Sequence, residues 1–416
     1  MKRLNSARKL ACKRGPVSRI LSVLLFVNLL FSTHSGGATA TAPKTLYFID
    51  PSATIRCGPD LRLCSFGSNV YVGPFASLTA GSTTPSITIG NDSNVQDNTI
   101  LDATNNRPIT LGNNVIIAHG ASVYGGARIG VSGESPVDIR ICASFVGFNS
   151  EVAEDAVVER NAMVTHLAKV GHHVTIPSGR VVLPGVDIEL QSQVPSKTVA
   201  IVDADRDFMA GVIEVNIALA HGYNLLQDES PDKVRGASVN PVTFYNDNSV
   251  PPTHNQQDIS NPNNPSRIVG DVRFTGAMPQ IGRSVAIRAD EGTPFAIRAG
   301  GTLANYTTFH ALKRTELDLG QNGRYGVGSL MHGGKFNNNV TKTGDNFELD
   351  QDSVFYSATA GNNCRIERMS FVADTNLPDN TIIPEKVIVI GACRSQVEWE
   401  RRDRTASRIS RGKRKR

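Results

Sequence analysis

The feature that most constrains the fold is a repeat of about six residues, grouped into longer periods near eighteen. Aliphatic-glycine pairs recur with glycine spacings of 17, 22, 18 and 17, at Val72-Gly73, Ile89-Gly90, Leu111-Gly112, Ile129-Gly130 and Val146-Gly147. Between them, aliphatic, small and polar residues alternate, as in ITLGNNVIIAHGASVYGG. Three such segments per turn predict a triangular coil with aliphatic side chains inside and Gly or Asn at the corners. Each coil would stack on the next.

The same pattern resumes later in the chain. The second set of glycine spacings is 18, 20, 24 and 17, at Ile281-Gly282, Ala299-Gly300, Leu319-Gly320, Thr343-Gly344 and Ala360-Gly361. An amphipathic helix does not fit either region, because glycine and β-branched residues fall at every corner. The 37 glycines and 6% aromatic content also suit short strands joined by tight corners. We therefore predict an all-β chain of two parallel β-helices.

One segment interrupts this pattern. Residues 205–227 have helical spacing, which predicts an α-helix that closes the first β-helix. Residues after it are rich in Asn, Pro, Ser and Gln, which is typical of a linker. The predicted divisions are 1–40 as a signal peptide, 41–228 and 267–396 as the two β-helices, 229–266 as the linker, and 397–416 as a basic tail.

The beginning of the chain predicts export. The first forty residues hold seven basic side chains and no acidic one. The basic side chains end at Arg19, and an apolar run follows over 20–31. That run is shorter than the roughly twenty residues that span a bilayer, and Ala38-Thr39-Ala40 supplies a small-residue cleavage site. We expect a signal peptide and a periplasmic or extracellular protein, with an uncleaved amino-terminal anchor as the alternative.

The net charge of +5 comes from the two ends of the chain. Residues 401–416 contain nine Lys or Arg, whereas residues 41–400 contain 27 basic and 37 acidic residues. The tail could bind an anionic surface such as lipid headgroups, or it could be a solvated, disordered segment. Export argues against nucleic acid as a partner.

Five of the six cysteines remain after removal of the signal segment. Cys57 and Cys64 have a spacing that suits a local disulfide in an oxidising compartment. Cys142 lies in an apolar repeat and is expected in the core. No pair has the C-x-x-C spacing of a cysteine zinc site.

Segments in both repeat regions match one family in the same order. Those of the first region, within residues 46–226, are GNDSNVQDNTILDA, LGNNVIIAHGASVYGG, VTIPSGRVVLPG and EVNIALAHGY. Those of the second, within residues 268–391, are VAIRADEGTPFAI, TTFHAL, LGQNGRYGVGSLMHGG and AGNNCRIERMSF. They resemble successive stretches of gamma-class carbonic anhydrases, so the chain looks like two tandem modules of that family. The resemblance implies that both β-helices are left-handed.

The resemblance also implies a metal site and an activity. Active members bind Zn²⁺, or a related divalent metal such as Fe²⁺ or Co²⁺, through three histidines at the interface between neighbouring β-helices of a trimer. Two of these ligands come from one β-helix and the third from its neighbour. Three neutral imidazoles leave an open position where water is activated to attack carbon dioxide and give bicarbonate. A homo-oligomer with trimeric β-helix rings is the implied assembly.

Neither module keeps the full set of family residues. The first retains the middle ligand as His119, but Asp102 and Tyr124 replace the other two. It also lacks the family's Arg-x-Asp-Glu segment, whose place is taken by residues 79–82. Gln96 and Asp97, and Asn216 on the predicted helix, are retained.

The second module has the opposite gaps. It keeps the first and third ligands as His310 and His332, with Val327 in the middle position. It keeps Arg288, Asp290 and Glu291, but Ala304-Asn305 replaces the Gln-Asp pair, and Lys313 stands where some members have a second acidic proton shuttle.

These losses are complementary and predict one composite metal site, formed by His119, His310 and His332 across an interface between unlike modules. The resemblance further implies that Gln96 hydrogen-bonds the reacting oxygen and that Glu291 relays its proton. In this prediction Arg288 pairs with Asp290 and with Asp97 across the interface.

Other interpretations of the same residues stay open. A lone histidine in a repeat is usually a corner or surface residue, Arg288 and its acidic neighbours could be an ordinary corner ion pair, and Asn216 could be a helix-surface residue. Three classes of function follow: a metal-dependent carbonic anhydrase, a non-catalytic relative with a structural or assembly role, and an acyltransferase on the same repeat fold. The third lacks any supporting pattern beyond the repeat.

Overall fold

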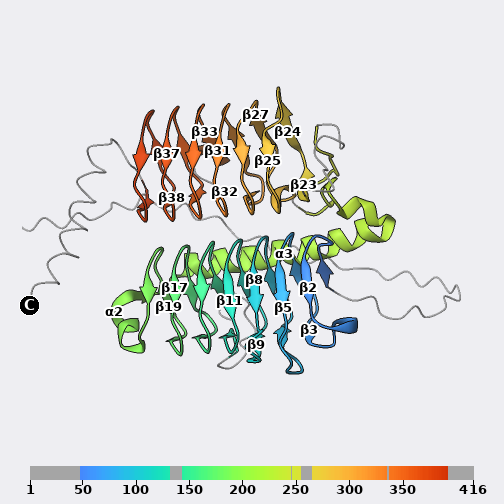
Figure 1. Cartoon of the computed structure of the whole chain (residues 1–416), viewed down its shortest axis with the longest axis vertical. Helices are drawn as coiled ribbons and strands as arrows, with labels where there is room; N and C mark the ends of the chain where they lie inside the picture. The colour runs from blue at the N-terminus through green and yellow to red at the C-terminus, as the bar shows by residue number, and fades with distance from the viewer. Residues whose placement is uncertain (1–46, 132–142, 245, 254–264, 335–336, 392–416) are drawn as a thin grey trace, which may run out of the picture. The chain divides into compact units, whose positions relative to one another are not determined.

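A computed structural model of the chain describes residues 47–131, 143–244, 246–253, 265–334 and 337–391 (Figure 1). The predicted signal peptide, the basic tail, Cys142 and Cys393 lie outside these residues. The described strands form six sheets, three in each of two β-helices. We name the sheets 1A, 1B and 1C in the first β-helix and 2A, 2B and 2C in the second.

In the first β-helix, each coil contributes short strands to three sheets. Sheet 1A contains β1 (Phe48–Ile49), β4 (Tyr71–Val72), β7 (Asn94–Val95), β10 (Val115–Ile117), β13 (Ser144–Val146), β16 (Met163–Val164), β19 (Arg180–Val182) and β21 (Thr198–Ala200). Sheet 1B contains β2 (Thr54–Arg56), β5 (Ser77–Thr79), β8 (Ile100–Asp102), β11 (Ser122–Tyr124), β14 (Glu151–Val152), β17 (Lys169–Val170) and β20 (Asp187–Ile188). Sheet 1C contains β3 (Cys64–Phe66), β6 (Ile87–Ile89), β9 (Ile109–Leu111), β12 (Arg128–Ile129), β15 (Val157–Val158) and β18 (Thr175–Ile176).

The second β-helix repeats this plan. Sheet 2A contains β22 (Ala237–Ser238), β23 (Ser266–Gly270), β26 (Val285–Ala289), β29 (Thr308–Ala311), β32 (Leu330–Gly333), β35 (Val354–Tyr356), β38 (Phe371–Ala373) and β41 (Ile388–Ile390). Sheet 2B contains β24 (Val272–Thr275), β27 (Phe295–Arg298), β30 (Glu316–Leu319), β33 (Val340–Thr343), β36 (Thr359–Ala360) and β39 (Asn376–Leu377). Sheet 2C contains β25 (Gln280–Ile281), β28 (Thr302–Leu303), β31 (Arg324–Tyr325), β34 (Glu348–Leu349), β37 (Arg365–Ile366) and β40 (Ile382–Ile383).

Parallel pairing between coils places equivalent residues one above the other. Val115 pairs with Ser144 in sheet 1A, and His310 pairs with His332 in sheet 2A. Corner asparagines such as Asn114, at φ 58°, adopt the left-handed conformation that Asn tolerates better than most side chains. The all-β prediction of two left-handed parallel β-helices is confirmed.

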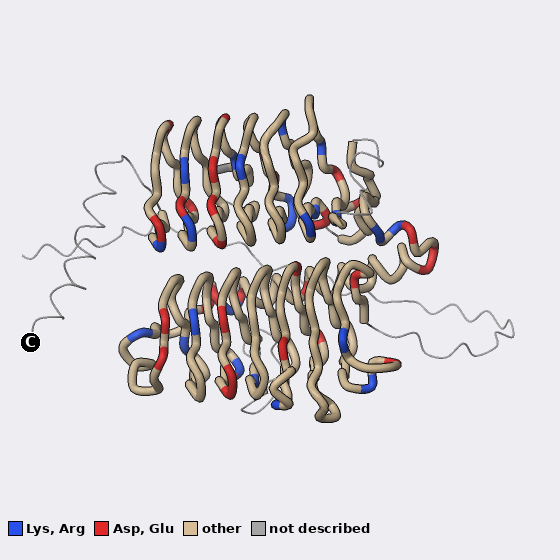
Figure 2. Tube along the Cα trace, viewed as in Figure 1, with Lys and Arg blue, Asp and Glu red and all other residues tan. Residues whose placement is uncertain are grey.

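Each β-helix has its own aliphatic core. In the first, the inward side chains are mostly Val, Ile, Leu and Ala, and in the second Phe joins them. Figure 2 marks the positions of the charged residues along the coils. Charged side chains of neighbouring coils pair, as Glu348 does with Arg324 and Arg365 in sheet 2C. The inward positions thus repeat at the spacing that the sequence predicts.

The predicted closing helix is confirmed as α3 (Asp203–Glu229), two residues longer at each end than expected. It begins where the Asp205 side chain accepts a hydrogen bond from the Val202 N–H. Its apolar face packs on the outside of sheet 1A, where Met209 and Ile213 join Ile116 and Phe145. None of the described helices combines the length and apolar character needed to cross a bilayer.

The remaining helices are short. They are η1 (Pro59–Leu61), η2 (Gln191–Gln193), α2 (Val194–Lys197), η3 (Pro231–Val234) and η4 (Asn337–Asn339). The segment expected as a linker contributes η3 and β22, and β22 pairs with β23 at the start of sheet 2A. Part of that segment therefore belongs to the second β-helix.

The disulfide between Cys57 and Cys64 is confirmed. It closes the η1 loop between β2 and β3. Among the described cysteines, Cys364 is a buried free thiol.

Candidate metal centre

The two β-helices of the chain contact each other through sheet 2A, whose β26, β29 and β32 strands are buried throughout. Leu330 and Val354 on its outer face join the cluster formed by sheet 1A and α3. Polar contacts cross the same interface: Asn98 donates to the Thr308 hydroxyl at 2.9 Å. A shared apolar cluster and buried polar contacts fix the register of one β-helix on the other.

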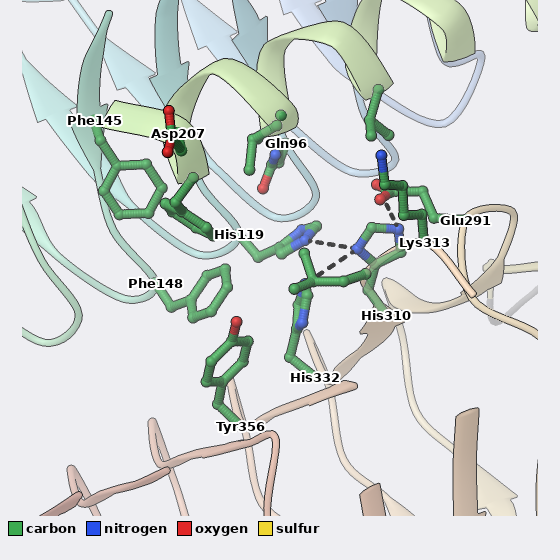
Figure 3. Close-up of a pocket in the computed structure, with 15 residues that line it drawn as sticks. Gln96, His119, Phe145, Phe148, Asp207, Glu291, His310, Lys313, His332 and Tyr356 are labelled. Atoms are coloured by element: carbon green, nitrogen blue, oxygen red, sulfur yellow. Dashed lines mark hydrogen bonds and ion pairs between the residues drawn. The ribbon is translucent and has the colours of Figure 1, made fainter. Parts of the chain in front are cut away.

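Three histidines meet at this interface (Figure 3). His119 follows β10 at a corner of the first β-helix, whereas His310 and His332 lie in register on β29 and β32 of the second. The Nε2 atom of His119 lies 3.2 Å from Nδ1 of His310, which lies 3.3 Å from Nε2 of His332. Nitrogens bound to one tetrahedral zinc at its usual bond length are about 3.3 Å apart. The three side chains therefore fit a divalent metal.

Burial favours the neutral form of all three imidazoles. Burial lowers the pKa of His119, it lowers the pKa of His332 well below its ordinary value, and burial and the nearby Arg288 lower the pKa of His310 to about 4. Only a neutral imidazole offers a lone pair to a metal. The protein thus presents three unprotonated ligands at neutral pH.

Acceptors behind each ring determine which nitrogen faces the centre. His119 Nδ1 lies 3.1 Å from Asp97 Oδ2, and His332 Nδ1 donates to the Gly333 carbonyl at 2.8 Å. His310 Nε2 lies 3.3 Å from Asp290 Oδ1. The charges of Asp97 and Asp290 and the Gly333 carbonyl favour the tautomers in which each outer nitrogen carries the proton, which leaves the inner nitrogens to bind a cation.

Arg288 connects the carboxylates behind the histidines. Its Nε donates to Asp97 at 3.0 Å and its Nη1 to Asp290 at 2.5 Å, with all three side chains buried. Burial alone would raise the pKa of each carboxyl, but Arg288 and the histidines outweigh it and hold both values below the ordinary range. Asp97 belongs to the first β-helix, so this ion pair network also crosses the interface.

Glu291 has the opposite electrostatic environment. Its Oε1 lies 3.4 Å from His310 Nε2, and burial together with the charge on Asp290 raises its pKa well above the ordinary value. In Figure 3, Glu291 and Lys313 lie beside His310, on the side away from Phe148 and Tyr356. Glu291 is therefore a buried carboxyl whose proton is held more tightly than that of an exposed glutamate.

A cavity of about 220 Å³ adjoins the histidines. Its walls are mostly apolar and come from both β-helices and from α3. The lining residues are Gln96, His119, Phe145, Phe148, Asp207, Phe208, Gly211, Val212, Val215, Glu291, His310, Leu312, Lys313, His332 and Tyr356. A small molecule in this space would lie beside the three imidazoles.

The structure brings together most of the residues singled out from the sequence. The three histidines, Asp97, Arg288, Asp290 and Glu291 form one contact network, and Gln96 lines the cavity. Asn216 is not brought into it: the side chain is buried on α3 and donates to the Val212 carbonyl at 2.8 Å. The amide group of Asn216 is thus engaged within its own helix.

The positions where ligands were replaced lie elsewhere. Asp102 and Tyr124 pair in register on β8 and β11 of sheet 1B, as His310 and His332 do on sheet 2A. Val327 is 42% exposed at a corner of the second β-helix. Among the described residues, the one group of three possible metal ligands consists of His119 from the first module and His310 and His332 from the second.

Several supporting residues were not singled out from the sequence. Phe148 stacks on His332 with ring centroids 5.0 Å apart, and His166 stacks on Phe148 at 4.4 Å. Tyr223 of α3 donates to Asp290. The helical period of α3 could have placed Tyr223 on the buried face, seven residues from Asn216, but not its partner on the other β-helix.

A pH dependence of stability follows from His166. Burial lowers its pKa from 6.5 to about 3, so it stays neutral in the folded chain while the unfolded chain takes up a proton below about pH 6.5. The free energy of unfolding should therefore fall between about pH 6.5 and pH 3, by up to about 1.4 kcal/mol per pH unit for this group.

The matched variant is His166→Asn, whose side-chain oxygen can still accept from the Phe148 N–H. Urea unfolding at pH 7 and pH 5 measures how far the free energy of unfolding falls on acidification. This fall should be smaller in His166→Asn than in the wild type by about 2 kcal/mol. Equal losses in both proteins would show that His166 is protonated in the folded state.

Comparison with known proteins relates the chain to two characterised sequences. It is 29% identical over 197 residues to a carbonic anhydrase of Methanosarcina thermophila, a match that covers 42% of this chain and 72% of that protein. It is also 29% identical over 134 residues to the carboxysome assembly protein CcmM of a Nostoc species, covering 30% of this chain and 23% of CcmM. No family model matches the chain.

Solved structures are more distant. A hexapeptide transferase family protein from Anaplasma phagocytophilum is 20% identical over 42% of this chain and 91% of its own, with a TM-score of 0.30. The Arabidopsis UDP-N-acetylglucosamine acyltransferase is 11% identical over 86% of this chain and 77% of its own, with a TM-score of 0.16. At these scores neither likeness bears on what the site does.

Proposed function

We propose that this chain, a gamma-class carbonic anhydrase-like protein by its sequence similarity, interconverts carbon dioxide and bicarbonate at one metal site shared by its two β-helices. The observation that carries the proposal is the group of three buried, neutral imidazoles at 3.2 and 3.3 Å, contributed by both β-helices. A divalent metal such as Zn²⁺, Fe²⁺ or Co²⁺, when bound there, supplies a Lewis acid that activates water at neutral pH.

The remaining residues of the site orient, bind and transfer protons. Asp97 and Asp290 hold the rings of His119 and His310, and Arg288 balances both carboxylates. Gln96 lines the cavity, and in this proposal its amide hydrogen-bonds the reacting oxygen atoms. Glu291, also at the cavity, carries the proton that hydration releases toward the exterior.

A second candidate function has support from one specific match. The likeness to a carboxysome assembly protein, together with the loss of ligands in each module, fits a non-catalytic role in assembly. Such a protein would use the two-β-helix body as a scaffold. The two candidates differ in whether the purified chain turns over carbon dioxide.

We expect the metal-loaded chain to hydrate carbon dioxide and the Glu291→Gln variant to do so more slowly. Loss of a general acid or base typically costs about 10²-fold or more. Stopped-flow hydration with a pH indicator, on preparations of matched metal content, measures both. Full occupancy without hydration by the wild type would favour the assembly role.

We further propose that the chain forms homo-oligomers, that it is exported, and that its basic tail binds an anionic surface. Homo-oligomers with trimeric β-helix rings would need a third β-helix, since one chain supplies two, and light scattering of the purified chain tests this. Export to the periplasm or the cell exterior, and binding of residues 397–416 to an anionic surface, are tested by fractionation and by vesicle binding.

A further inference from the structure

Gly211 stands out among the residues of α3. It lies inside a 27-residue helix, where Gly is less favourable than Ala by about 1 kcal/mol. Close packing commonly accounts for such a glycine, and it does so at Gly222 of the same helix, where a Cβ would lie 2.7 Å from Pro241. At Gly211 an added Cβ would meet no heavy atom within 4 Å. Packing therefore does not explain this glycine.

The open space at Gly211 borders the cavity beside the histidines. Gly211 lines that cavity together with Asp207, Phe208, Val212 and Val215 of the same helix. Phe208 and Val212 are partly buried, whereas Asp207 is exposed, so this stretch of α3 runs from the cavity wall to solvent. Gly211, one helical turn after Asp207, lies at that transition.

The size of the cavity indicates how far a side chain at position 211 would narrow it. Its volume of about 220 Å³ exceeds the roughly 150 Å³ of an apolar cavity that admits benzene. Phe145, Phe148 and Phe208 contribute aromatic walls. A leucine at position 211 would add four carbon atoms at the edge of this space, which is enough to narrow it but not to fill it.

We infer that Gly211 is an access-determining residue, which keeps open a passage along α3 by which small molecules and ions reach the histidine cluster. The passage takes small uncharged molecules along its aromatic walls. The identity of the substrate, carbon dioxide, rests on the proposed function. The passage itself rests on the open space at Gly211 and on the cavity.

The test compares Gly211→Leu and Gly211→Ala with the wild type and with Ala204→Leu, a matched change at an exposed position of α3. The first readout is the rate of Co²⁺ uptake by the metal-free chain, followed by absorbance. Gly211→Leu should take up Co²⁺ at least about tenfold more slowly, a barrier increase of about 1.4 kcal/mol, and reach the same final content. Ala204→Leu should match the wild type, and Gly211→Ala should lie in between.

The second readout is kcat/KM for carbon dioxide hydration, which should fall in the same order. Thermal unfolding controls for folding, because Ala and Leu both favour a helix more than Gly, so neither variant should be less stable. Uptake of Co²⁺ by Gly211→Leu at the wild-type rate would overturn the inference. If the wild type does not hydrate carbon dioxide but Gly211→Leu still slows uptake, the passage stands and the proposed function fails.

Discussion

Replacement of His119 by alanine is expected to remove the metal as completely as replacement of His310 or His332. His119 is the only contribution of the first β-helix to the three-ligand group that the described residues contain. Two remaining imidazoles hold a divalent cation poorly, and we expect the affinity to fall by at least about 100-fold. Metal analysis after dialysis, with competition by a chelator, measures this loss in each of the three variants.

The matched control is His172→Ala, which removes an exposed histidine from the first β-helix. It should leave metal content and affinity unchanged. Val327→His and Tyr124→His should not increase metal content, because each adds one ligand at a position away from the cluster. Full metal content and unchanged affinity in His119→Ala would show that the two β-helices do not share a site.

Replacement of Arg288 by leucine is expected to give the largest loss of stability of any single charge removal in the site. Arg288 is buried and pairs with Asp97 and Asp290, which are buried as well. Removing it leaves two carboxylates without a counter-charge in a region shielded from water, and breaking a buried pair costs about 3–5 kcal/mol. Urea unfolding of metal-free protein at neutral pH measures the difference.

Arg298→Leu is the control for the charge change. Arg298 pairs with Asp318 on the surface of the second β-helix and is 40% exposed, so its removal should cost about 0–1 kcal/mol. Adding Asp97→Asn and Asp290→Asn to Arg288→Leu removes the stranded charges and should recover part of the loss. If Arg288→Leu lowers the free energy of unfolding by no more than Arg298→Leu does, water reaches the carboxylates of Asp97 and Asp290.

The fold could be predicted because the repeat carries its own period. Corner residues such as Asn114 recur along the chain, inward aliphatic residues such as Ile117 stack on aliphatic residues of the neighbouring coils, and parallel stacking of similar coils leaves little choice of register. The helix at Asp203–Glu229 was predictable from its spacing. The role of β22 was not, since two residues inside a polar segment carry no periodic signal.

The sequence predicted the composition of the site and its division between unlike modules, but not which chain would supply the partner module. The resemblance to a family supplied His119, His310 and His332, and the complementary losses indicated that they act together. Nothing in the sequence indicated that the two β-helices of one chain would supply the interface. That contact depends on the apolar outer faces of sheets 1A and 2A meeting α3, with Leu330 and Phe145 in one cluster.

The aromatic support of the site was also beyond sequence reasoning. Phe148, Tyr356 and His166 lie on different coils and come together only through stacking and through the contact between the β-helices. Asn216 shows the reverse case: its motif position suggested a role, but its amide bonds the Val212 carbonyl one turn earlier in α3. A motif position fixes the backbone location and leaves the side-chain partner open.

One chain is expected to hold one metal site, built from both β-helices. Titration of the metal-free chain with Co²⁺, followed by the visible absorbance of the bound ion, tests it most directly. We expect an end point at one equivalent per chain, with no such end point in His119→Ala. An end point at two equivalents, or no tight binding by the wild type, would contradict it.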